Sequence, residues 1–581
     1  MEAEFMFEAA PELRVSVAGF TDKGPKKVNQ DFHGARQPSP NMLTMKGITL
    51  VMADGISSSP VSQIASETAV KTFLEDYYCT SEAWSVRTSV EKVLSAINSW
   101  LFAQSQQGPG RYNKDQGYVC TLSALVVKHH LAHVFHVGDT RVYSLSNKGL
   151  TQVTHDHKLW VSESENYLNR AMGMHPKCEL DYQAVPLEVG QFFILCTDGV
   201  YNFVQEADFI RILNNHKADL QQAAQALIAH ALAAGSNDNL SVQLLRVDEV
   251  PKAASQQIKQ QAEALPLPPP LQPHRSFDGY QVLRQIHNSN RSHIYLVQDM
   301  QSHKKLVLKT PSLELSKDPE SLEHFLREEW IARRVNSAHV LKADLAQRQP
   351  NFLYTLFEHI EGQTLAQWAI DHPKPSLEKV RDIIEQVAKG LNSLHKMEML
   401  HQDIRPENIM IDQNGTVKII DFGSVYVAGL AESSPEQGYN HLKGSALYSA
   451  PEYFLGDAGS VKSELFSLGI LTYFLLSGRY PYSTQVAQAK TLSKQRNLYY
   501  HPVRDEYSEI PVWVDYAIQQ AVHPLPESRH SDVFEFMHNL RHPSHAFLRE
   551  TRPPLIERNP VLIWQVISAF FALLAFYFYL I

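Results

Sequence analysis

The sequence has few cysteines, no excess of positive charge and no long apolar run at its beginning. Its four cysteines lie far apart along 581 residues, so we expect neither a disulfide framework nor a cysteine-paired metal site, which fits a reducing compartment. The formal net charge of −9 gives no support to nucleic-acid binding, which depends on a cationic surface. Residues 1–11 are acidic and too short of apolar side chains for a signal peptide. The length favours two or three domains.

One long apolar run is present, at residues 561–581. It carries no charged side chain, and as a helix it would be about 31 Å long, enough to span a hydrocarbon core. Trp564 stands near one end, as interfacial residues do. Three arginines precede the run: Arg549, Arg552 and Arg558. We therefore expect a single-pass, C-terminal membrane anchor with the rest of the chain in the cytoplasm. A buried C-terminal helix is the alternative.

The chain divides into five stretches by composition. Residues 13–250 form a first unit, in which short apolar strands alternate with turn residues. Residues 251–276 are rich in Gln, Ala and then Pro, which favours a semi-rigid spacer; binding of a partner by the prolines is the alternative. Residues 277–545 form a second unit. Residues 546–560 are a juxtamembrane connection to the predicted transmembrane helix at 561–581.

Periodicity places several elements in the first unit. Apolar runs predict strands at 48–52, 122–127, 132–137, 192–196 and 240–245. Amphipathic patterns predict helices at 61–78 and 89–104.

Aspartates in the first unit follow strand ends and stand beside small residues. A small neighbour lets the backbone turn away and leaves the carboxylate exposed in a cleft. A single Asp-Gly pair is also typical of an ordinary turn. Five such positions in order along one unit point instead to a shared site. They are Asp31, Asp54, Asp139, Asp198 and Asp238.

This pattern resembles the metal-dependent protein phosphatases of type 2C, together with the segments 117–124, 170–173 and 235–242. The resemblance implies two antiparallel sheets packed face to face, with helices outside. It also implies that two Mn²⁺ or Mg²⁺ ions are held by the Gly55 carbonyl and four carboxylates, those of Asp31, Asp54, Asp198 and Asp238. Asp139 matches a ligand of a third metal ion, and Lys26 matches the phosphate-binding position.

Physical chemistry agrees with this expectation. Clustered carboxylates repel one another, and divalent cations remove that penalty. Hard oxygen ligands favour Mg²⁺ or Mn²⁺ over Zn²⁺, and two such ions can activate a bridging water. Three residues depart from the family: Lys26 replaces Arg, Gln30 replaces Glu, and Ile56 replaces a His found in some relatives. We expect an active but slower phosphatase; a relative that only binds phosphoproteins is the alternative.

The second unit holds a separate set of motifs. The run 401–408 contains Asp403 and, five residues later, Asn408; Asp421 then begins Asp-Phe-Gly, and Ala-Pro-Glu lies at 450–452. In this order, the first Asp can accept the proton of an attacking hydroxyl. The Asn and the second Asp can hold Mg²⁺ against nucleotide phosphates.

These motifs resemble those of the eukaryotic-type protein Ser/Thr kinases, which implies a bilobal fold that binds ATP with Mg²⁺. By resemblance, Lys309 pairs with nucleotide phosphates and with Glu328, and Arg405 replaces a Lys that contacts the transferred phosphate. Residues 356–362 resemble the hinge that receives adenine. Two further matches are structural: Glu452 with Arg529 as an ion pair, and Glu464 where an Asp braces the catalytic loop.

The glycine-rich loop departs most from the kinase pattern, because His287, Ser289 and Ser292 stand where glycines let backbone amides approach phosphate. An inactive pseudokinase that regulates the phosphatase is therefore an alternative. Gln402 replaces an Arg that grips an activation-loop phosphate, so such phosphorylation is not strictly required. Three serines are candidate autophosphorylation sites or plain solvated residues: Ser433, Ser434 and Ser445.

The sequence thus predicts a multidomain α+β chain with a phosphatase β-sandwich, a bilobal kinase and one transmembrane helix. We expect a bifunctional signalling enzyme that acts on protein Ser/Thr and phospho-Ser/Thr, itself included, and binds ATP and the membrane but no nucleic acid. A non-catalytic, membrane-tethered scaffold is a further alternative.

Overall fold

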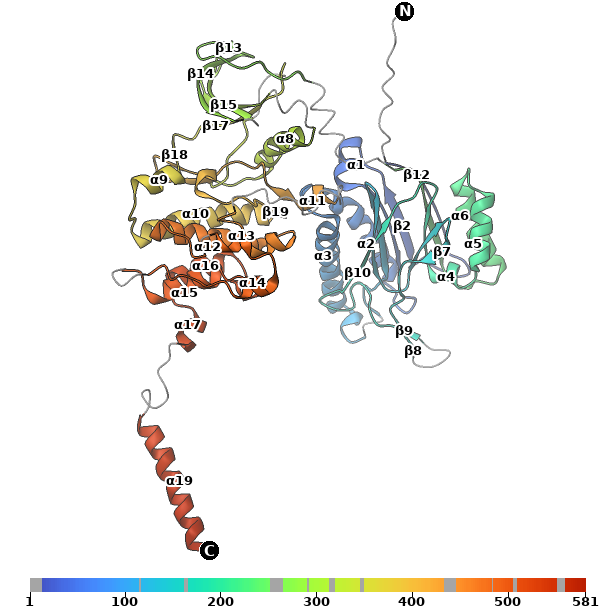
Figure 1. The fold of residues 1–581 in the computed structure, drawn as a ribbon. Coiled ribbons are helices and arrows are strands. Elements are labelled where there is room, and N and C mark those ends of the chain that lie inside the picture. The colour runs from blue at the N-terminus through green and yellow to red at the C-terminus, as the bar shows by residue number, and fades with distance from the viewer. Residues whose placement is uncertain are drawn as a thin grey trace, which may run out of the picture. The chain divides into compact units, whose positions relative to one another are not determined.

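A computed structural model describes residues 13–113, 116–160, 166–250, 265–289, 292–312, 319–344, 350–432, 446–482, 484–504, 509–550 and 560–580. It forms two compact units (Figure 1). The first contains residues 1–266 with the short segments 397–399 and 426–438, and the second contains the remainder. Most of the predicted linker, and Ser433, Ser434 and Ser445, lie outside the described residues.

Two five-stranded antiparallel sheets make up the first unit. One has the order β1 (Arg14–Asp22), β12 (Leu240–Glu249), β11 (Phe192–Cys196), β6 (Arg141–Ser146) and β7 (Gly149–Gln152). The other has the order β10 (Asp181–Pro186), β5 (Leu131–Val137), β4 (Leu122–Lys128), β3 (Ile48–Asp54) and β2 (Asp31–Arg36). A small separate ladder pairs β8 (Lys158–Trp160) with β9 (Asn166–Leu168).

Helices cover the outer faces of both sheets, as Figure 1 shows. Helices α2 (Ser62–Asp76) and α3 (Val86–Gln106) share a core with β3 and β4, and α5 (Glu206–Asn215) and α6 (Leu220–Ala233) share one with β11 and β12. The first unit also contains two short helices, α1 (Pro40–Lys46) and α4 (Asp198–Tyr201). The sandwich flanked by helices that the sequence predicted is therefore present.

Strand β3 shows why these segments read as unbroken apolar runs. Leu50 and Met52 face the core between the sheets, whereas Val51 and Ala53 face the helices. A strand covered on both faces needs apolar side chains at every position rather than at alternate ones. The strands and helices predicted from periodicity in this unit are accordingly found, with ends that differ by a few residues.

The second unit has a strand-rich part and a helical part. Its five-stranded sheet has the order β13 (Ser276–Phe277), β14 (Tyr280–Asn288), β15 (Ser292–Asp299), β16 (Lys305–Pro311) and β17 (Thr355–Glu358). Helix α8 (Pro319–Arg334) lies between β16 and β17 along the chain. The longer helices are α9 (Leu365–Asp371), α10 (Leu377–His395), α12 (Val461–Ser477), α15 (Val512–Ala521) and α16 (Val533–Arg541). A small sheet joins β18 (Gly362–Thr364), β20 (Ile409–Asp412) and β21 (Val417–Ile419).

The remaining elements are short, apart from the last helix. They are β19 (Met399–Leu400), β22 (Tyr426–Val427), α11 (Ala428–Ala431), α13 (Gln485–Gln488), α14 (Leu492–Arg496), α17 (His545–Glu550) and α19 (Pro560–Leu580). Across the described part of the chain, no helix meets the length and apolarity needed to cross a bilayer. The membrane anchor at 561–581 stays a prediction.

Candidate active sites

The acidic cluster of the first unit begins with two strands that end side by side. Asp31 starts β2 and Asp54 ends β3, and the two are directly opposite each other in the antiparallel pair. Opposite residues project to the same face of a sheet. Burial raises the pKa of Asp31 to about 6 and that of Asp54 well above its usual range. Neighbouring carboxylates, first of all Asp31, raise the pKa of Asp54 further.

The other predicted aspartates join this cluster from separate elements. Asp198 starts α4 directly after β11, Asp238 stands just before β12, and Asp139 follows β5. Burial is the main cause that raises the pKa of Asp198 to about 7, and the charges of Asp139 and Asp238 add to it. The fold therefore brings the five sequence-predicted carboxylates into one electrostatic site.

Gly55 and Lys26 complete the predicted set. A Cβ on Gly55 would lie 2.8 Å from the Ser62 carbonyl oxygen, so only glycine fits against the start of α2. The Lys26 ammonium lies 3.1 Å from an Asp238 oxygen, and its side chain is about one-third exposed. It thus presents a positive charge at the rim of the acidic cluster.

The donor chemistry of this cluster fits a hard divalent cation. Every predicted ligand offers oxygen, and one oxygen of Asp31, Oδ1, is buried with no hydrogen-bond partner among the described residues. Burial is the main cause of the raised pKa values of Asp54 and Asp198, and repulsion between the carboxylates, which a divalent cation would remove, adds to it. Among the described residues, no three Asp, Glu, His or Cys side chains are already arranged as a metal cage. The assignment of ligands therefore stays a prediction.

Gln30 has a role that the sequence did not reveal. Its side-chain amide donates to the Ser59 carbonyl at 3.0 Å and to the Ser62 hydroxyl at 2.6 Å. These bonds fasten the loop that follows Asp54 and Gly55. A carboxylate cannot donate to a carbonyl, so the amide at this position suits the loop of this chain.

In the second unit, Lys309 of β16 and Glu328 of α8 form the predicted ion pair. Their charged atoms lie 2.5 Å apart, and the two side chains are 13% and 10% exposed. Burial by itself would lower the pKa of Lys309, but the charges of Glu328 and Asp421 outweigh it and raise this pKa. The lysine is thus held charged beside the Asp-Phe-Gly motif.

The predicted base and Mg²⁺ ligands also lie together. The Asn408 side-chain amide donates to the backbone oxygen of Asp403 at 2.9 Å and to its carboxylate at 2.8 Å. The backbone carbonyl of Asn408 accepts from the backbone amide of Ile420 at 2.8 Å, which ties this loop to the residue before Asp421. Asp421 has a left-handed backbone (φ 64°), and its carboxylate accepts from the Gly423 amide at 3.1 Å.

Arg405 and Glu464, two further residues that the sequence singled out, lie near this loop. Arg405 donates to Glu407 at 2.8 Å, so the Glu407 carboxylate would compete with a phosphate for the Arg405 guanidinium. Glu464 is buried and accepts from the Gln402 amide at 2.9 Å, as expected of the residue that braces the catalytic loop. His395, which sequence reasoning missed, lies 2.5 Å from the other oxygen of Glu464. A helix-end His facing a helix-start Glu gives no sequence signal.

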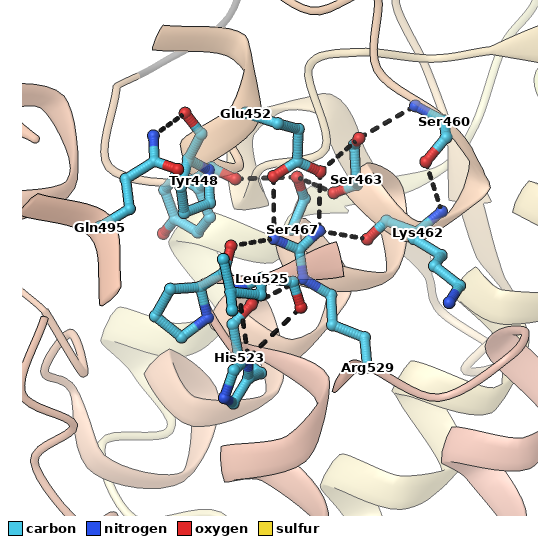
Figure 2. Close-up of polar contacts among 12 residues, drawn as sticks. Tyr448, Glu452, Ser460, Lys462, Ser463, Ser467, Gln495, His523, Leu525 and Arg529 are labelled. Carbon is cyan, nitrogen blue, oxygen red and sulfur yellow. Dashed lines mark hydrogen bonds and ion pairs between the residues drawn. The ribbon is translucent and has the colours of Figure 1, made fainter. Parts of the chain in front are cut away.

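The predicted pair of Glu452 and Arg529 is bidentate (Figure 2), with N···O distances of 2.7 and 2.8 Å. Glu452 also accepts from the Ser463 hydroxyl at 2.6 Å, and Arg529 donates to the His523 carbonyl at 2.7 Å. The ion pair is almost fully buried, so its hydrogen bonds replace water on every side. It joins the 3-10 turn Pro451–Leu455 to the segment that precedes α16, and Ser463 ties the start of α12 to it.

The turn in place of the glycine-rich loop is closed by serine. The Ser292 amide donates to the Ser289 hydroxyl at 3.1 Å, and the Ser289 amide donates to the Ser292 carbonyl at 3.1 Å. His287 is exposed on β14, next to a break in the pairing register with β15. This turn therefore satisfies its own polar groups with serine where the kinase pattern has glycine.

Comparisons with known proteins agree with these two sites. The protein kinase domain family matches residues 280–545, and the protein phosphatase 2C family matches residues 24–236. Serine/threonine-protein kinase PrkC of Bacillus subtilis is 29% identical over 229 residues, which cover 37% of this chain and 34% of that protein. Serine/threonine-protein kinases PknA of Corynebacterium glutamicum is 30% identical over 203 residues, covering 34% and 43%. The chain spans less than half the length of either kinase.

One solved structure similar to this chain is the catalytic domain of the serine/threonine protein phosphatase PstP, in complex with two manganese ions. It shares 22% identity and has a TM-score of 0.34, over 41% of this chain and 100% of that chain. The two family matches, with the similarity to Ser/Thr protein kinases, show a protein phosphatase 2C domain and a Ser/Thr protein kinase domain in one chain.

Proposed function

We propose that the chain is a bifunctional signalling enzyme that phosphorylates protein Ser/Thr with ATP and hydrolyses phospho-Ser/Thr, including phosphates on itself. The observation that carries this proposal is that each unit brings its main sequence-predicted residues together. One fold collects five carboxylates and a lysine, and the other collects the Lys309–Glu328 pair, the proposed base and the two proposed Mg²⁺ ligands.

In the phosphatase site, Asp31, Asp54, Asp198 and Asp238 with the Gly55 carbonyl would hold Mn²⁺ or Mg²⁺. A bound pair of such ions supplies an activated water and steadies displacement at phosphorus. Lys26 would bind the substrate phosphate as a point charge, without the fork that arginine offers. Gln30 holds the adjoining loop in place while the substrate enters.

In the kinase site, Asp403 would accept the proton of the attacking hydroxyl. Its carboxylate is oriented by the amide of Asn408, whose side-chain oxygen is left for Mg²⁺ together with Asp421. Lys309 is kept charged and directed by Glu328, so it can pair with the phosphates of ATP. Arg405 would leave Glu407 to contact the transferred phosphate.

Action of the phosphatase on the kinase half is supported by their covalent linkage. Tethering on one chain raises effective concentration to about the millimolar scale when the linker can bridge the two sites. The test uses the full-length chain with γ-³²P ATP. We expect Asp198→Asn to accumulate more label than wild type, and Asp198→Asn with Asp403→Asn to accumulate none. Equal label in wild type and Asp198→Asn would show that the enzyme does not reverse its own phosphorylation.

The second candidate function is a phosphatase regulated by a pseudokinase. The observation that favours it is the Ser289–Ser292 turn, because the Ser292 amide already donates to a hydroxyl and is not free for a phosphate. A pseudokinase predicts no label in any of the three chains. Mn²⁺-dependent hydrolysis of a phenyl phosphate that is lost in Asp54→Asn would meanwhile exclude a non-catalytic scaffold.

We also propose that α19 anchors the protein in a membrane, with both enzyme domains in the cytoplasm. Several large apolar side chains of this helix are exposed, among them Trp564, Phe570 and Leu573. Leaving such side chains in water is unfavourable by about 1.5–3 kcal/mol each relative to burial. The full-length chain should stay in the membrane pellet after alkaline carbonate extraction. Arginine at Phe570 and Leu573 should release it, whereas Phe570→Leu should not.

A further inference from the structure

A second lysine lies inside the acidic cluster and belongs to none of the expected motifs. The Lys158 ammonium is 2.7 Å from a carboxylate oxygen of Asp139, and their side chains are 13% and 10% exposed. Lys158 also lies 3.2 Å from the hydroxyl of Tyr201, to which it donates. That hydroxyl in turn donates to the Asp139 backbone oxygen at 3.0 Å. The ammonium is therefore held on Asp139 by two routes.

The backbone fixes this contact through the residues just before each partner. The His157 amide donates to the Gly138 carbonyl at 2.8 Å, and the Gly138 amide donates to the His157 ring at 3.0 Å. A reciprocal pair of bonds between 138 and 157 sets 139 and 158 side by side. On the far side, Asp156 is gripped by Arg141 through two bonds of 2.9 and 2.8 Å. Lys158 therefore projects from a backbone segment that these hydrogen bonds hold in place.

Charge balance shows what this lysine does for the site. Of the five carboxylates, Asp139 alone has an ammonium this close and this well buried; Lys26, which is on Asp238, is one-third exposed. A divalent ion at Asp139 would have to displace a hydrogen-bonded ammonium and then sit beside it. Two cations in a weakly solvated site repel strongly, and the displaced ammonium would lose its partner.

We infer that Lys158 is the permanent counter-ion of Asp139 and takes the place of a third divalent cation, so that the phosphatase centre of this chain holds two metal ions. The inference rests on the proposed metal-dependent phosphatase and concerns the same site. It assigns Lys158 a positioning role: it neutralises Asp139 and leaves the four remaining carboxylates to the two ions.

The experiment counts bound Mn²⁺ per full-length chain, without nucleotide, by equilibrium dialysis with elemental analysis and by calorimetry. Every chain carries Asp421→Asn, so that the kinase site contributes no ion. We expect two ions in this parent chain and three after Lys158→Met, which keeps an unbranched side chain only one atom shorter but removes its charge. Adding Asp139→Asn to Lys158→Met should return the count to two.

Matched controls separate charge from structure. Lys158→Arg, which keeps the charge, and Lys148→Met, at an exposed turn of the same unit, should both bind two ions. If Lys158→Met loses its cooperative thermal transition, Lys158→Gln replaces it with the same expectation. Three ions in the parent chain, or two in a folded charge-free variant, would overturn the inference. Binding of no ion by any chain would instead overturn the proposed metal centre itself, and the inference with it.

Discussion

Asp31, which is buried, and Asp54, which is half-buried, face each other across two adjacent antiparallel strands, at the point where β2 begins and β3 ends. Such neighbours are about 5 Å apart at Cβ, so their charges meet in a weakly solvated place. The fold therefore keeps two repelling carboxylates together. The repulsion between the two carboxylates should lower the stability of the metal-free protein. A bound divalent cation should remove that loss, because both carboxylates can then act as ligands.

Replacing Asp54 with Asn should have opposite effects on stability with and without Mn²⁺. Without metal the variant should melt at a higher temperature than wild type, because one repelling charge is gone. With Mn²⁺ the order should reverse, and phosphatase activity should fall by at least about 100-fold. Differential scanning calorimetry with chelator and then with Mn²⁺ measures both melting temperatures. Glu75→Gln, on the exposed face of α2, is the control and should leave the order unchanged.

Replacing Gln30 with Glu should weaken the phosphatase unit even though the shapes match. The substitution removes the donor to the Ser59 carbonyl and adds a charge next to Asp31, and an unsatisfied buried group costs about 1–3 kcal/mol. Urea unfolding of the metal-free protein measures the loss. Added Mn²⁺ should recover part of it, since the cation offsets the extra charge. Equal stability of Gln30→Glu and wild type would contradict the assigned role of the amide.

Breaking the buried pair of Glu452 and Arg529 from one side should cost about 3–5 kcal/mol, because the remaining charge stays buried without a partner. Glu452→Gln and Arg529→Met should each show this loss in urea unfolding. The double variant should lose less than the sum of the two, since it leaves no orphaned charge. Additive losses would mean that the pair contributes nothing as a unit. Arg479→Met, at an exposed turn, is the control.

His530 should make the kinase unit sensitive to acid. The residue is 1% exposed, neither ring nitrogen has a hydrogen-bond partner in the part of the chain that the structure describes, and burial lowers its pKa to about 4. An unfolded histidine has a pKa of about 6.5, so at lower pH the unfolded chain takes up a proton that the folded one refuses. Stability is unaffected above pH 6.5 and falls as the pH drops toward 4, by about 2 kcal/mol at pH 5.

The measurement is the free energy of unfolding at pH 8 and pH 5 for wild type and His530→Leu. The variant should lose less stability between the two values than wild type. His501→Leu, at an exposed position, should behave as wild type does. An unchanged pH dependence in His530→Leu would show that this ring is not the titrating group.

Several structural predictions from the sequence hold because they depend on local pattern. Strand β3 was predicted because a strand buried on both faces is apolar throughout, and α3 because its apolar positions recur at helical spacing. Strand β1 was missed, since its polar and small residues become a strand only by pairing along β12. Strand β2 was missed for the same reason, although its first residue, Asp31, was singled out.

By itself, the sequence determined the two families of motifs, the order of the units and the identity of the aspartates, because those depend on residue type and spacing along the chain. Only the tertiary structure decided which residues contact one another. Asp31 stands opposite Asp54, Gln30 donates a hydrogen bond to the loop after Gly55, and Lys158 forms an ion pair with Asp139. Those contacts join residues 19 to 32 positions apart, and strand register and loop closure set them. Strand register cannot be read from one local stretch of sequence. The ion pair between Lys158 and Asp139, from which we infer that a lysine replaces a third metal ion, could therefore be recognised only in the tertiary structure.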